Sequence, residues 1–289
     1  TVNAATVNTA PAAVISSGPG DGFQAFFDAG RTRVFNVYHH SGVSASLDCH
    51  VIATGATCFG FPFNFGAETQ EAAYGTVVGT KIWLPANFNG AGGLPTGTGM
   101  RCVDIASVLS SGGAPRMCTT PYVSFGSINA FPTHFTGGST AGLSGETKLY
   151  LLRSTTATPL VYCLDTATMA ACSTSTLTPG VAGNSWSAVD ASDILKSGDL
   201  IYVSVVDDSA NAVRLSCLVA STGSLCPGWT AGRVVITKVG SAGYQLGGRF
   251  FELPNSTGGT RGVCYQAPTV VADKCWAPDG TEFAAATYN

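Results

Sequence analysis

The sequence contains little charge, few histidines and few tryptophans. Asp, Glu, Lys and Arg together make up 11% of the 289 residues, and there are only 4 His, 4 Trp and 3 Met. Because about a quarter of an ordinary domain is charged, this surface must consist mainly of Thr, Ser, Gly, Asn and Ala. A net charge of -3 gives no basic footprint for nucleic acid and no polybasic patch for anionic lipid. We therefore expect no nucleic-acid binding. No run reaches the length of a membrane span, so we also expect no membrane insertion.

Common catalytic motifs are also missing. The sequence has no Gly-x-Ser-x-Gly elbow, no His-Glu-x-x-His and no phosphate-binding glycine loop, so nucleophilic hydrolysis has no candidate residue. Helical periodicity is nearly absent; residues 105–110 are the one candidate helical turn, with an enlarged hairpin loop as the alternative. The chain starts at Thr1 with neither Met nor a signal peptide, so we expect a processed chain or a fragment of a longer one.

Cysteine, in contrast, is plentiful and regularly spaced. The residues from Cys163 to Cys172 form a short apolar strand, an Asp/Thr turn and a second strand, which predicts a β-hairpin with a disulfide across it. All 10 cysteines fall into such neighbouring pairs: Cys49 with Cys58, Cys102 with Cys118, Cys163 with Cys172, Cys217 with Cys226, and Cys264 with Cys275. Zinc binding is the alternative, but the spacing lacks the C-x-x-C knuckle. Five disulfides favour an oxidising location, and we expect a secreted, extracellular or cell-surface protein.

A repeating unit precedes each cysteine pair. It consists of a Gly, a basic or polar residue, an aliphatic residue and an aromatic residue. The five aromatic residues, which we call the aromatic column, are Phe35, Trp83, Tyr150, Tyr202 and Phe251. They advance by 48, 67, 52 and 49 residues, which indicates five structural repeats, the second of them enlarged.

Strands that are apolar on both faces suggest how these repeats pack. Residues 149–152 and 201–203 do not alternate between apolar and polar, so both faces of each strand must be covered. That requirement favours a β-propeller over a two-sheet sandwich. We therefore predict an all-β protein with an N-terminal arm or linker at 1–11 and, at 12–289, a single β-propeller. We expect five four-stranded blades, each with one hairpin disulfide, and six blades are the alternative.

The hairpin sequence also resembles a known repeat. The stretch from Tyr162 to Thr168, a strand followed by an apolar-Asp-x-x-Thr turn, is similar to the repeat of quinoprotein-type (PQQ-like) β-propellers, with cysteines at the hairpin flanks. The family usually has a Gly after the Thr, which the fourth unit keeps at Gly223. It also has a Trp that closes the hairpin, whereas here Trp229 and Trp276 follow the second Cys. The resemblance implies a fold more firmly than an activity.

Acidic residues at the turns are the first candidate site residues. Asp48, Asp104 and Asp165 recur near the hairpins, and we expect them to bond their own backbone in Asx-turns rather than to converge in a central channel. The fourth and fifth units have Val219 and Gln266 at the position of Asp165, which a shared catalytic role would not tolerate.

For the other polar and aromatic candidates we also expect structural roles. The segment from Asp207 to Asn211 is read as a solvated turn rather than a calcium site, because it lacks EF-hand spacing. The imidazoles are His39, His40, His50 and His134, of which the first two are expected at a turn. Alternating Phe59, Phe61, Phe63 and Phe65 predict the inward face of a strand, with a stacking surface for sugar or a partner as the alternative. We expect no metal site and no cofactor.

For function, we expect a non-catalytic extracellular structural or adhesive protein, either a surface-filament subunit or a cell-surface binding module for a glycan or another surface ligand. The alternative is a carbohydrate-active enzyme, which needs two carboxylates in the central funnel. Its candidates are Glu68, Glu71, Glu146 and Glu252, the last of them in an apolar strand. A quinone-dependent dehydrogenase is the weakest reading, because 4 Trp hardly supply such a site.

The chain ends suggest how the protein assembles. If residues 12–276 complete five blades, the β-capable pieces 1–8 and 281–288 are left over, and their unpaired backbone groups invite another chain. We expect self-assembly through these terminal strands, with Val2, Val7, Phe283 and Tyr288 as the assembly residues. The alternative is that the two ends pair with each other and leave a monomer.

Overall fold

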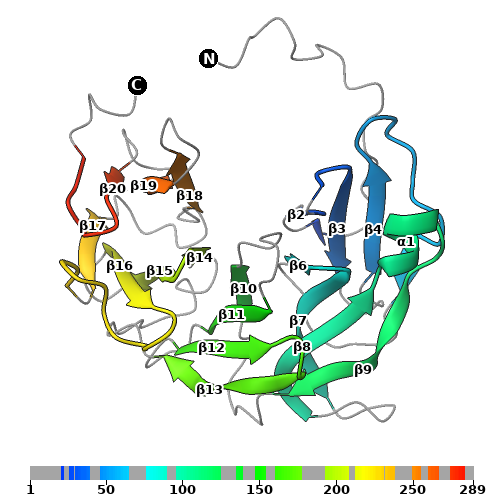
Figure 1. Cartoon of the computed structure of the whole chain (residues 1–289), viewed down its shortest axis with the longest axis horizontal. Helices are drawn as coiled ribbons and strands as arrows, with labels where there is room; N and C mark the ends of the chain where they lie inside the picture. The colour runs from blue at the N-terminus through cyan, green and yellow to red at the C-terminus, as the bar shows by residue number, and fades with distance from the viewer. Residues whose placement is uncertain are drawn as a thin grey trace, which may run out of the picture.

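The protein is an assembly of β-strands with one short helix (Figure 1). It is described here from a computed structural model. The structure describes residues 21–22, 26–28, 30–39, 46–64, 76–89, 96–124, 135–138, 147–153, 160–177, 193–207, 212–230, 232–237, 249–254, 260–266 and 274–283. The predicted arm at 1–11 lies outside these residues.

The strands form five small antiparallel sheets that follow one another in chain order around an arc (Figure 1). The first sheet contains β1 (Asp21–Gly22), β2 (Phe26–Phe27), β3 (Arg33–His39), β4 (Ser46–Val51) and β5 (Phe63–Asn64). The second contains β6 (Thr76–Val78), β7 (Lys81–Asn89), β8 (Thr96–Asp104) and β9 (Arg116–Ser124), with helix α1 (Ala106–Ser111) between β8 and β9.

The other three sheets repeat this up-and-down order. The third contains β10 (Phe135–Gly138), β11 (Lys148–Arg153), β12 (Leu160–Asp165) and β13 (Ala170–Leu177). The fourth contains β14 (Asp193–Ser197), β15 (Leu200–Asp207), β16 (Ala212–Val219) and β17 (Arg233–Thr237). The fifth contains β18 (Arg249–Pro254), β19 (Thr260–Gln266) and β20 (Lys274–Trp276).

In the second and fourth sheets, the glycine of the repeating unit makes the tight turn between the first two strands. Val78 pairs with Lys81, and Ser197 pairs with Leu200, so each loop has two residues. The first of these is Gly79 or Gly198, with φ of 60° and 57°. Such positive values favour glycine and suit the twist of a two-residue hairpin.

The hydrophobic core lies between the sheets rather than inside any one of them. The opening strands of successive sheets lie side by side for β2 with β6, β10 with β14, and β14 with β18, and β10 also lies beside β7, the second strand of the second sheet. Four clusters of buried apolar side chains fill the interfaces between the first and second, second and third, third and fourth, and fourth and fifth sheets. We call these interfaces the first, second, third and fourth seams. Each inner sheet is therefore covered on both faces, as the doubly apolar strands predict.

The aromatic column keeps one register in all five sheets. Each member pairs across the ladder with the first cysteine of its own sheet: Phe35 with Cys49, Trp83 with Cys102, Tyr150 with Cys163, Tyr202 with Cys217, and Phe251 with Cys264. The first four are buried in the seam toward the following sheet, but Phe251 is 40% exposed. Among the described residues, no apolar cluster joins the fifth sheet to another sheet beyond it, so Phe251 does not share the burial of the other four.

The structure contains five disulfides, each within one sheet: Cys49–Cys58, Cys102–Cys118, Cys163–Cys172, Cys217–Cys226 and Cys264–Cys275. The first four lie in the four seams, beside the aromatic column. The entropic model assigns about 2–3 kcal/mol to a bridge that closes so short a loop. Such a set of bridges is typical of an oxidising environment.

Two details of the sheets differ from the sequence-based expectation. The described sheets have five, four, four, four and three strands rather than four each, because β1 and β2 both pair along β3 and the fifth sheet has three described strands. Their place just before the fifth repeat predicts that residues 233–239 open the fifth sheet, yet β17 closes the fourth sheet by pairing with β16. After the Cys226 turn the chain thus returns to its own sheet.

Residues 106–111 form a helix that ends at Gly112, with φ of 66°.

Tyr202 and Phe251 provide a matched test of this packing. Tyr202 lies in the fourth seam, with ring centroids 5.6 Å from Trp229 and 6.3 Å from Phe250. Tyr202→Ala should lower the free energy of unfolding by about 3–5 kcal/mol, as deletions of buried aromatics do. Phe251→Ala should cost less than about 2 kcal/mol, because the ring is already partly in water. Denaturant titration measures both, and equal losses would contradict the register.

Candidate functional site

Most described carboxylates hold turns through backbone hydrogen bonds. Oδ1 of Asp165 accepts hydrogen bonds from the N–H groups of Ala167 at 2.8 Å and Thr168 at 3.2 Å, which confirms the expected Asx-turn. Oδ1 of Asp104 accepts from the N–H of Ala106 at 2.9 Å, where α1 begins. These side chains therefore organise hairpins and do not converge as a catalytic pair.

Asp48 differs from this expectation. It lies inside β4 and pairs with His50, whose Nε2 is 3.0 Å from Oδ2 of Asp48, while Oδ1 accepts from the N–H of Cys49 at 2.9 Å. His50 Nδ1 lies 3.3 Å from the carbonyl oxygen of Gly55 in the following turn. Through these two contacts of its ring, His50 connects Asp48 in β4 to the turn before Cys58. An Asx-turn is wrong for Asp48, because the cysteine follows it directly and extends the strand.

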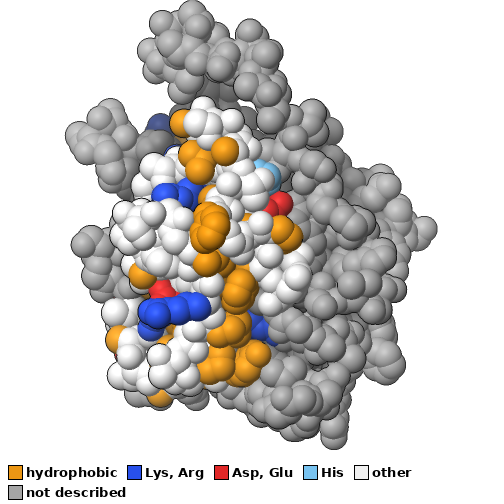
Figure 2. All heavy atoms as spheres, turned by 90° about the vertical axis from the view of Figure 1, so that its right-hand side faces the viewer, with side chains coloured by type: hydrophobic (Ala, Val, Ile, Leu, Met, Phe, Trp, Pro, Cys, Tyr) orange, Lys and Arg blue, Asp and Glu red, His pale blue; other side chains and the backbone are white. Residues whose placement is uncertain are grey.

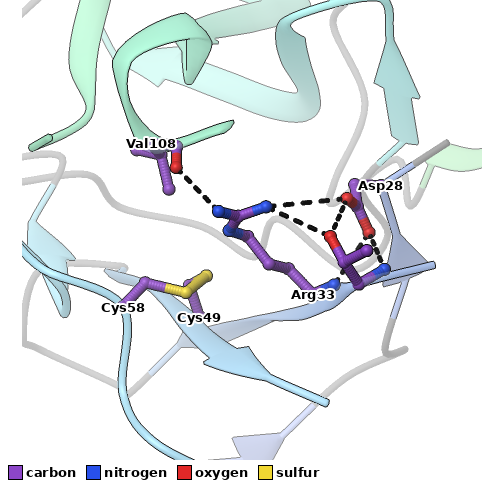
Figure 3. A network of polar contacts seen from close by, with 6 residues as sticks. Asp28, Arg33, Cys49, Cys58 and Val108 are labelled. Carbon is purple, nitrogen blue, oxygen red and sulfur yellow. Dashed lines mark hydrogen bonds and ion pairs between the residues drawn. A yellow bond between two sulfur atoms is a disulfide. The ribbon is translucent and has the colours of Figure 1, made fainter. Parts of the chain in front are cut away.

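A basic residue near the aromatic column crosses the first seam. Nη2 of Arg33 donates to the carbonyl oxygen of Val108 in α1 at 3.0 Å, and Figure 3 shows its guanidinium between Asp28 and Val108, near the Cys49–Cys58 disulfide. Nη1 lies 3.9 Å from Oδ2 of Asp28. Oδ1 of Asp28 also accepts from the N–H groups of Thr32 and Arg33 at 2.7 and 2.8 Å. The positive charge is thus neutralised by protein groups.

In the second and third seams, the basic residues at the position of Arg33 are Lys81 and Lys148, and each of them lines a hollow. The third-seam hollow has a volume of about 280 Å³ and is lined by Thr147, Lys148, Tyr150, Lys196, Asp199, Ala220 and Ser221. The second-seam hollow has about 140 Å³ and is lined by Lys81, Asp104, Cys118, Thr119, Thr120 and Met169. Two of the five lysines of the chain, Lys148 and Lys196, meet in the larger hollow. No sequence motif pointed to it, because the two lysines come from different repeats.

The phenylalanine stripe is only partly inward. Phe61 and Phe63 pack against the core of the first seam, but Phe59 is 72% exposed, and Phe65 lies outside the described residues. Ile52, just after β4, is 48% exposed. Figure 2, which views the side of the molecule with β4 and α1, shows apolar side chains gathered in one column. The inward reading is thus wrong for Phe59, because the residue lies in the turn after Cys58 and not in a strand.

Other expected site residues are placed only in part. Glu252 lies in β18 and is exposed. Its charge contributes to the raised pKa of Tyr202, which is about 12 mainly because the Tyr202 side chain is buried. His39 ends β3, and Asp207 ends β15. Outside the described residues lie Glu68, Glu71, Glu146, His40, His134, Asp208 and Asn211. The carboxylate pair of a glycoside-cleaving enzyme therefore stays an untested expectation.

Of the expected assembly residues, the structure describes Phe283. Its N–H donates to the carbonyl oxygen of Cys275 at 2.8 Å, and a Cβ added to Gly262 would lie 2.7 Å from the ring. The guanidinium carbon of Arg261 lies 5.1 Å from the ring centroid. This part of the C-terminal piece packs on its own sheet, whereas Val2, Val7 and Tyr288 lie outside the described residues. Assembly through the terminal strands stays a prediction.

Arg101 is a fully buried cation that the sequence analysis did not single out. It lies in β8, with its guanidinium carbon 5.7 Å from the ring centroid of Tyr122 in β9. Burial lowers its pKa to about 10, and the interaction with Tyr122 partly offsets that effect. Its place within one sheet is consistent with a structural role.

Neither a metal centre nor a membrane helix is found in the part of the chain that the structure describes. None of these residues form a group of three or more His, Cys, Asp or Glu side chains that could hold a metal ion. The described helix is too short to cross a membrane.

Comparisons with known proteins concern the fold alone. No protein-family model matches the sequence, and no curated protein is similar to it. Among solved structures, the chain is similar to AofleA from Arthrobotrys oligospora, with a TM-score of 0.54 and 10% identity over 92% of this chain and 72% of that one. The fold is β-propeller-like. A prolyl endopeptidase gives a TM-score of 0.51 at 10% identity over 91% of this chain, which spans only 35% of that protein.

A third similar structure is TolB from Acinetobacter baumannii, with a TM-score of 0.47 and 10% identity, over 93% of this chain and 54% of that one. Likenesses at this level of identity describe the arrangement of sheets and not an activity.

The Asp104 carboxylate gives a pH-dependent prediction. Burial acts to raise its pKa, but the Ala106 N–H and the Arg116 guanidinium, 2.9 Å from Oδ2, outweigh burial and lower it. Because the folded pKa is below the unfolded one, this stabilisation is complete above about pH 4 and is lost as the pH falls through the folded pKa. Asp104→Asn should make the loss of stability in acid shallower, as should Arg116→Gln. Unfolding curves from pH 7 to 2 that superpose on those of the unmodified chain would contradict this.

Proposed function

We propose that this chain is a non-catalytic extracellular structural or adhesive protein that assembles head to tail, as a surface-filament subunit does. The proposed unit is a five-bladed propeller of quinoprotein-like repeats, one sheet to a blade. Its end blades present faces to neighbouring copies. The five disulfides support an extracellular location, because such bridges persist in oxidising surroundings.

The observation that carries this proposal is the exposure of Phe251. Its four equivalents in the aromatic column are at most 2% exposed, because each packs on the following sheet, whereas Phe251 is 40% exposed. Leu253 shares this face, since side chains two residues apart in a strand point the same way, and it is half-buried. The fifth sheet thus offers the surface that the other four sheets use for packing, without a described partner for it.

The opposite end of the chain offers a second apolar group. Phe27 pairs with Val34 in the first sheet, on the face directed away from the first seam, and is 50% exposed. Asn36, Asp48 and His50 share this face through the pairings of Asn36 with Asp48 and of Val34 with His50. A contact between the fifth sheet of one copy and the first sheet of the next would join two different surfaces. Such a heterologous contact builds a filament when its rotation does not close.

The terminal segments belong to the same proposal. Residues 1–8 and 284–288 lie at the two ends of the sequence and are β-capable, so strand addition between copies through them would reinforce the contact between end sheets. The exposed side chain of Phe59 would serve adhesion, because exposed apolar groups can form interaction surfaces.

Assembly is tested with one charged substitution in each exposed surface. Light scattering of the intact chain should report particles that grow with concentration well above the 29.4 kDa of one chain. Phe251→Asp should remain monomeric, because a carboxylate cannot be buried against an apolar face without a partner. The matched control Phe59→Asp changes an equally apolar but unrelated surface and should assemble like the intact chain.

Deletion of residues 1–11 separates the two parts of the interface. Weaker assembly after the deletion assigns the arm a role, and unchanged assembly restricts the contact to the end sheets. An intact chain that stays monomeric at all concentrations overturns the proposal and indicates a ring closed within one molecule.

A further inference from the structure

We infer that the proposed head-to-tail contact repeats the packing of an inner seam, with the ring of Phe251 in one copy against Ile52 in the next copy. The inference rests on the proposed function and adds to it the residues that meet and their register. Its partner is a second copy of this chain, because Phe251 is 40% exposed and Ile52 is 48% exposed in the same molecule. The two side chains therefore do not cover each other within one chain.

One residue recurs at the same place in four of the sheets, just after the strand of the first cysteine. Its N–H donates to the carbonyl oxygen of the residue three positions before the aromatic column. We call this residue the turn position, and its four hydrogen bonds are Ile52 to Thr32 at 2.9 Å, Ile105 to Thr80 at 2.8 Å, Thr166 to Thr147 at 2.7 Å, and Ala220 to Asp199 at 2.7 Å. The shared bond shows that the four residues are structurally equivalent.

In the inner sheets, the turn position is buried against the preceding sheet. Ile105 lies in the first-seam cluster together with the column residue Phe35, and Ala220 lies in the third-seam cluster together with the column residue Tyr150. Tyr150 and Ala220 also line the same hollow. Thr166, at the turn position of the third sheet, is buried as well. An inner seam thus brings the column residue of one sheet to the turn position of the next sheet.

Ile52 holds the turn position in the first of the described sheets, at one end of the arc (Figure 1). Cys49 of β4 lies in the first-seam cluster, so strand alternation directs His50 and then Ile52 to the opposite face. On that face, Phe27 of β2 occupies the place that the buried Val77 of β6 has in the second sheet. Ile52 and Phe27 are both exposed, although an inner sheet buries these positions against the sheet before it.

The first seam provides the template for the contact, because it uses the same two residue types. A phenylalanine of the aromatic column and an isoleucine of the turn position make both pairs, Phe35 with Ile105 in the first seam and Phe251 with Ile52 in the proposed contact. The second and third seams use other pairs, Trp83 with Thr166 and Tyr150 with Ala220. Two residues beyond the column, the buried Val37 of the first sheet corresponds to Leu253 of the fifth. The fifth sheet would therefore meet the next copy as the first sheet meets the second.

The Asp48–His50 pair on the outer face of the first sheet does not prevent burial of that face. Oδ2 of Asp48 lies 3.0 Å from Nε2 of His50, and Oδ1 accepts from the N–H of Cys49 at 2.9 Å. Nδ1 of His50 lies 3.3 Å from the carbonyl oxygen of Gly55. Burial of polar groups is costly mainly when they lack hydrogen-bond partners, and these groups already have them. Ile52 and Phe27 are the apolar groups that a partner would cover.

A charged substitution tests whether Ile52 lies in the contact. Ile52→Asp should raise the concentration at which light scattering detects assembly by roughly ten-fold or more, because its carboxylate would lie against an apolar ring. Leu225→Asp is the matched control, since Leu225 is an exposed apolar residue in the corresponding turn of the fourth sheet, which is not an end sheet. It should assemble like the intact chain. Assembly of Ile52→Asp at the concentration that the intact chain needs overturns the inference and leaves a filament held by other residues.

A mixture of two blocked chains tests whether the two faces are complementary. Ile52→Asp blocks the first-sheet face and Phe251→Asp blocks the fifth-sheet face, so each variant alone should stay monomeric. In a mixture, the intact Phe251 of one variant can still pack on the intact Ile52 of the other, which should give dimers of twice the 29.4 kDa of one chain and nothing larger. A mixture that stays monomeric, while the intact chain assembles, overturns the inference.

Alanine substitutions test the pairing itself. Ile52→Ala and Phe251→Ala should each raise the concentration needed for assembly roughly ten-fold, because each removes buried apolar atoms from the contact. The double variant should raise it by less than the product of the two factors, since residues in contact are not additive. A double variant whose loss equals that product overturns the pairing of Phe251 with Ile52 but not the filament. An intact chain that stays monomeric at all concentrations overturns the proposed filament, and the pairing with it.

Discussion

Burial of both faces of each inner sheet is the constraint on which the rest of this structure depends. A strand such as β15 directs Ile201 and Val203 into the third seam and Tyr202 into the fourth, so neither face can be left in water. Stacking the sheets in chain order satisfies this requirement with local connections only. It also creates two end faces, on the first and fifth sheets, where the repetition stops. The exposure of Phe27 and Phe251 follows from that arrangement.

The scarcity of charge explains the use that the protein makes of its polar groups. Asp165, Asp104 and Asp199 each hold a turn by accepting backbone N–H hydrogen bonds, and Asp48 fastens β4 through His50. With so few charged groups, carboxylates that are engaged in turns are not available as a catalytic pair.

The local features of the fold could be predicted from the sequence, because they depend on neighbouring residues. Hairpin spacing indicated the disulfide partners, and doubly apolar strands indicated sheets covered on both sides. Properties set by partners far along the chain could not be predicted. The alternation of Phe59 to Phe63 did not reveal that the Cys58 turn leaves Phe59 in solvent. The strand at 233–237 had no signal that assigned it to the fourth sheet. Lys148 and Lys196 are 48 residues apart, so only the packed seam brings them together.

The central claim is that the core lies between successive sheets, and a double-mutant cycle across the fourth seam tests it most directly. Trp229 of the fourth sheet and Trp276 of the fifth have ring centroids 6.1 Å apart. Replacing each by Leu, singly and together, should reveal a coupling energy of about 0.5–1.5 kcal/mol. Trp276 and Trp83, which belong to different seams, should be additive within about 0.5 kcal/mol. A coupling near zero between Trp229 and Trp276 would contradict the account.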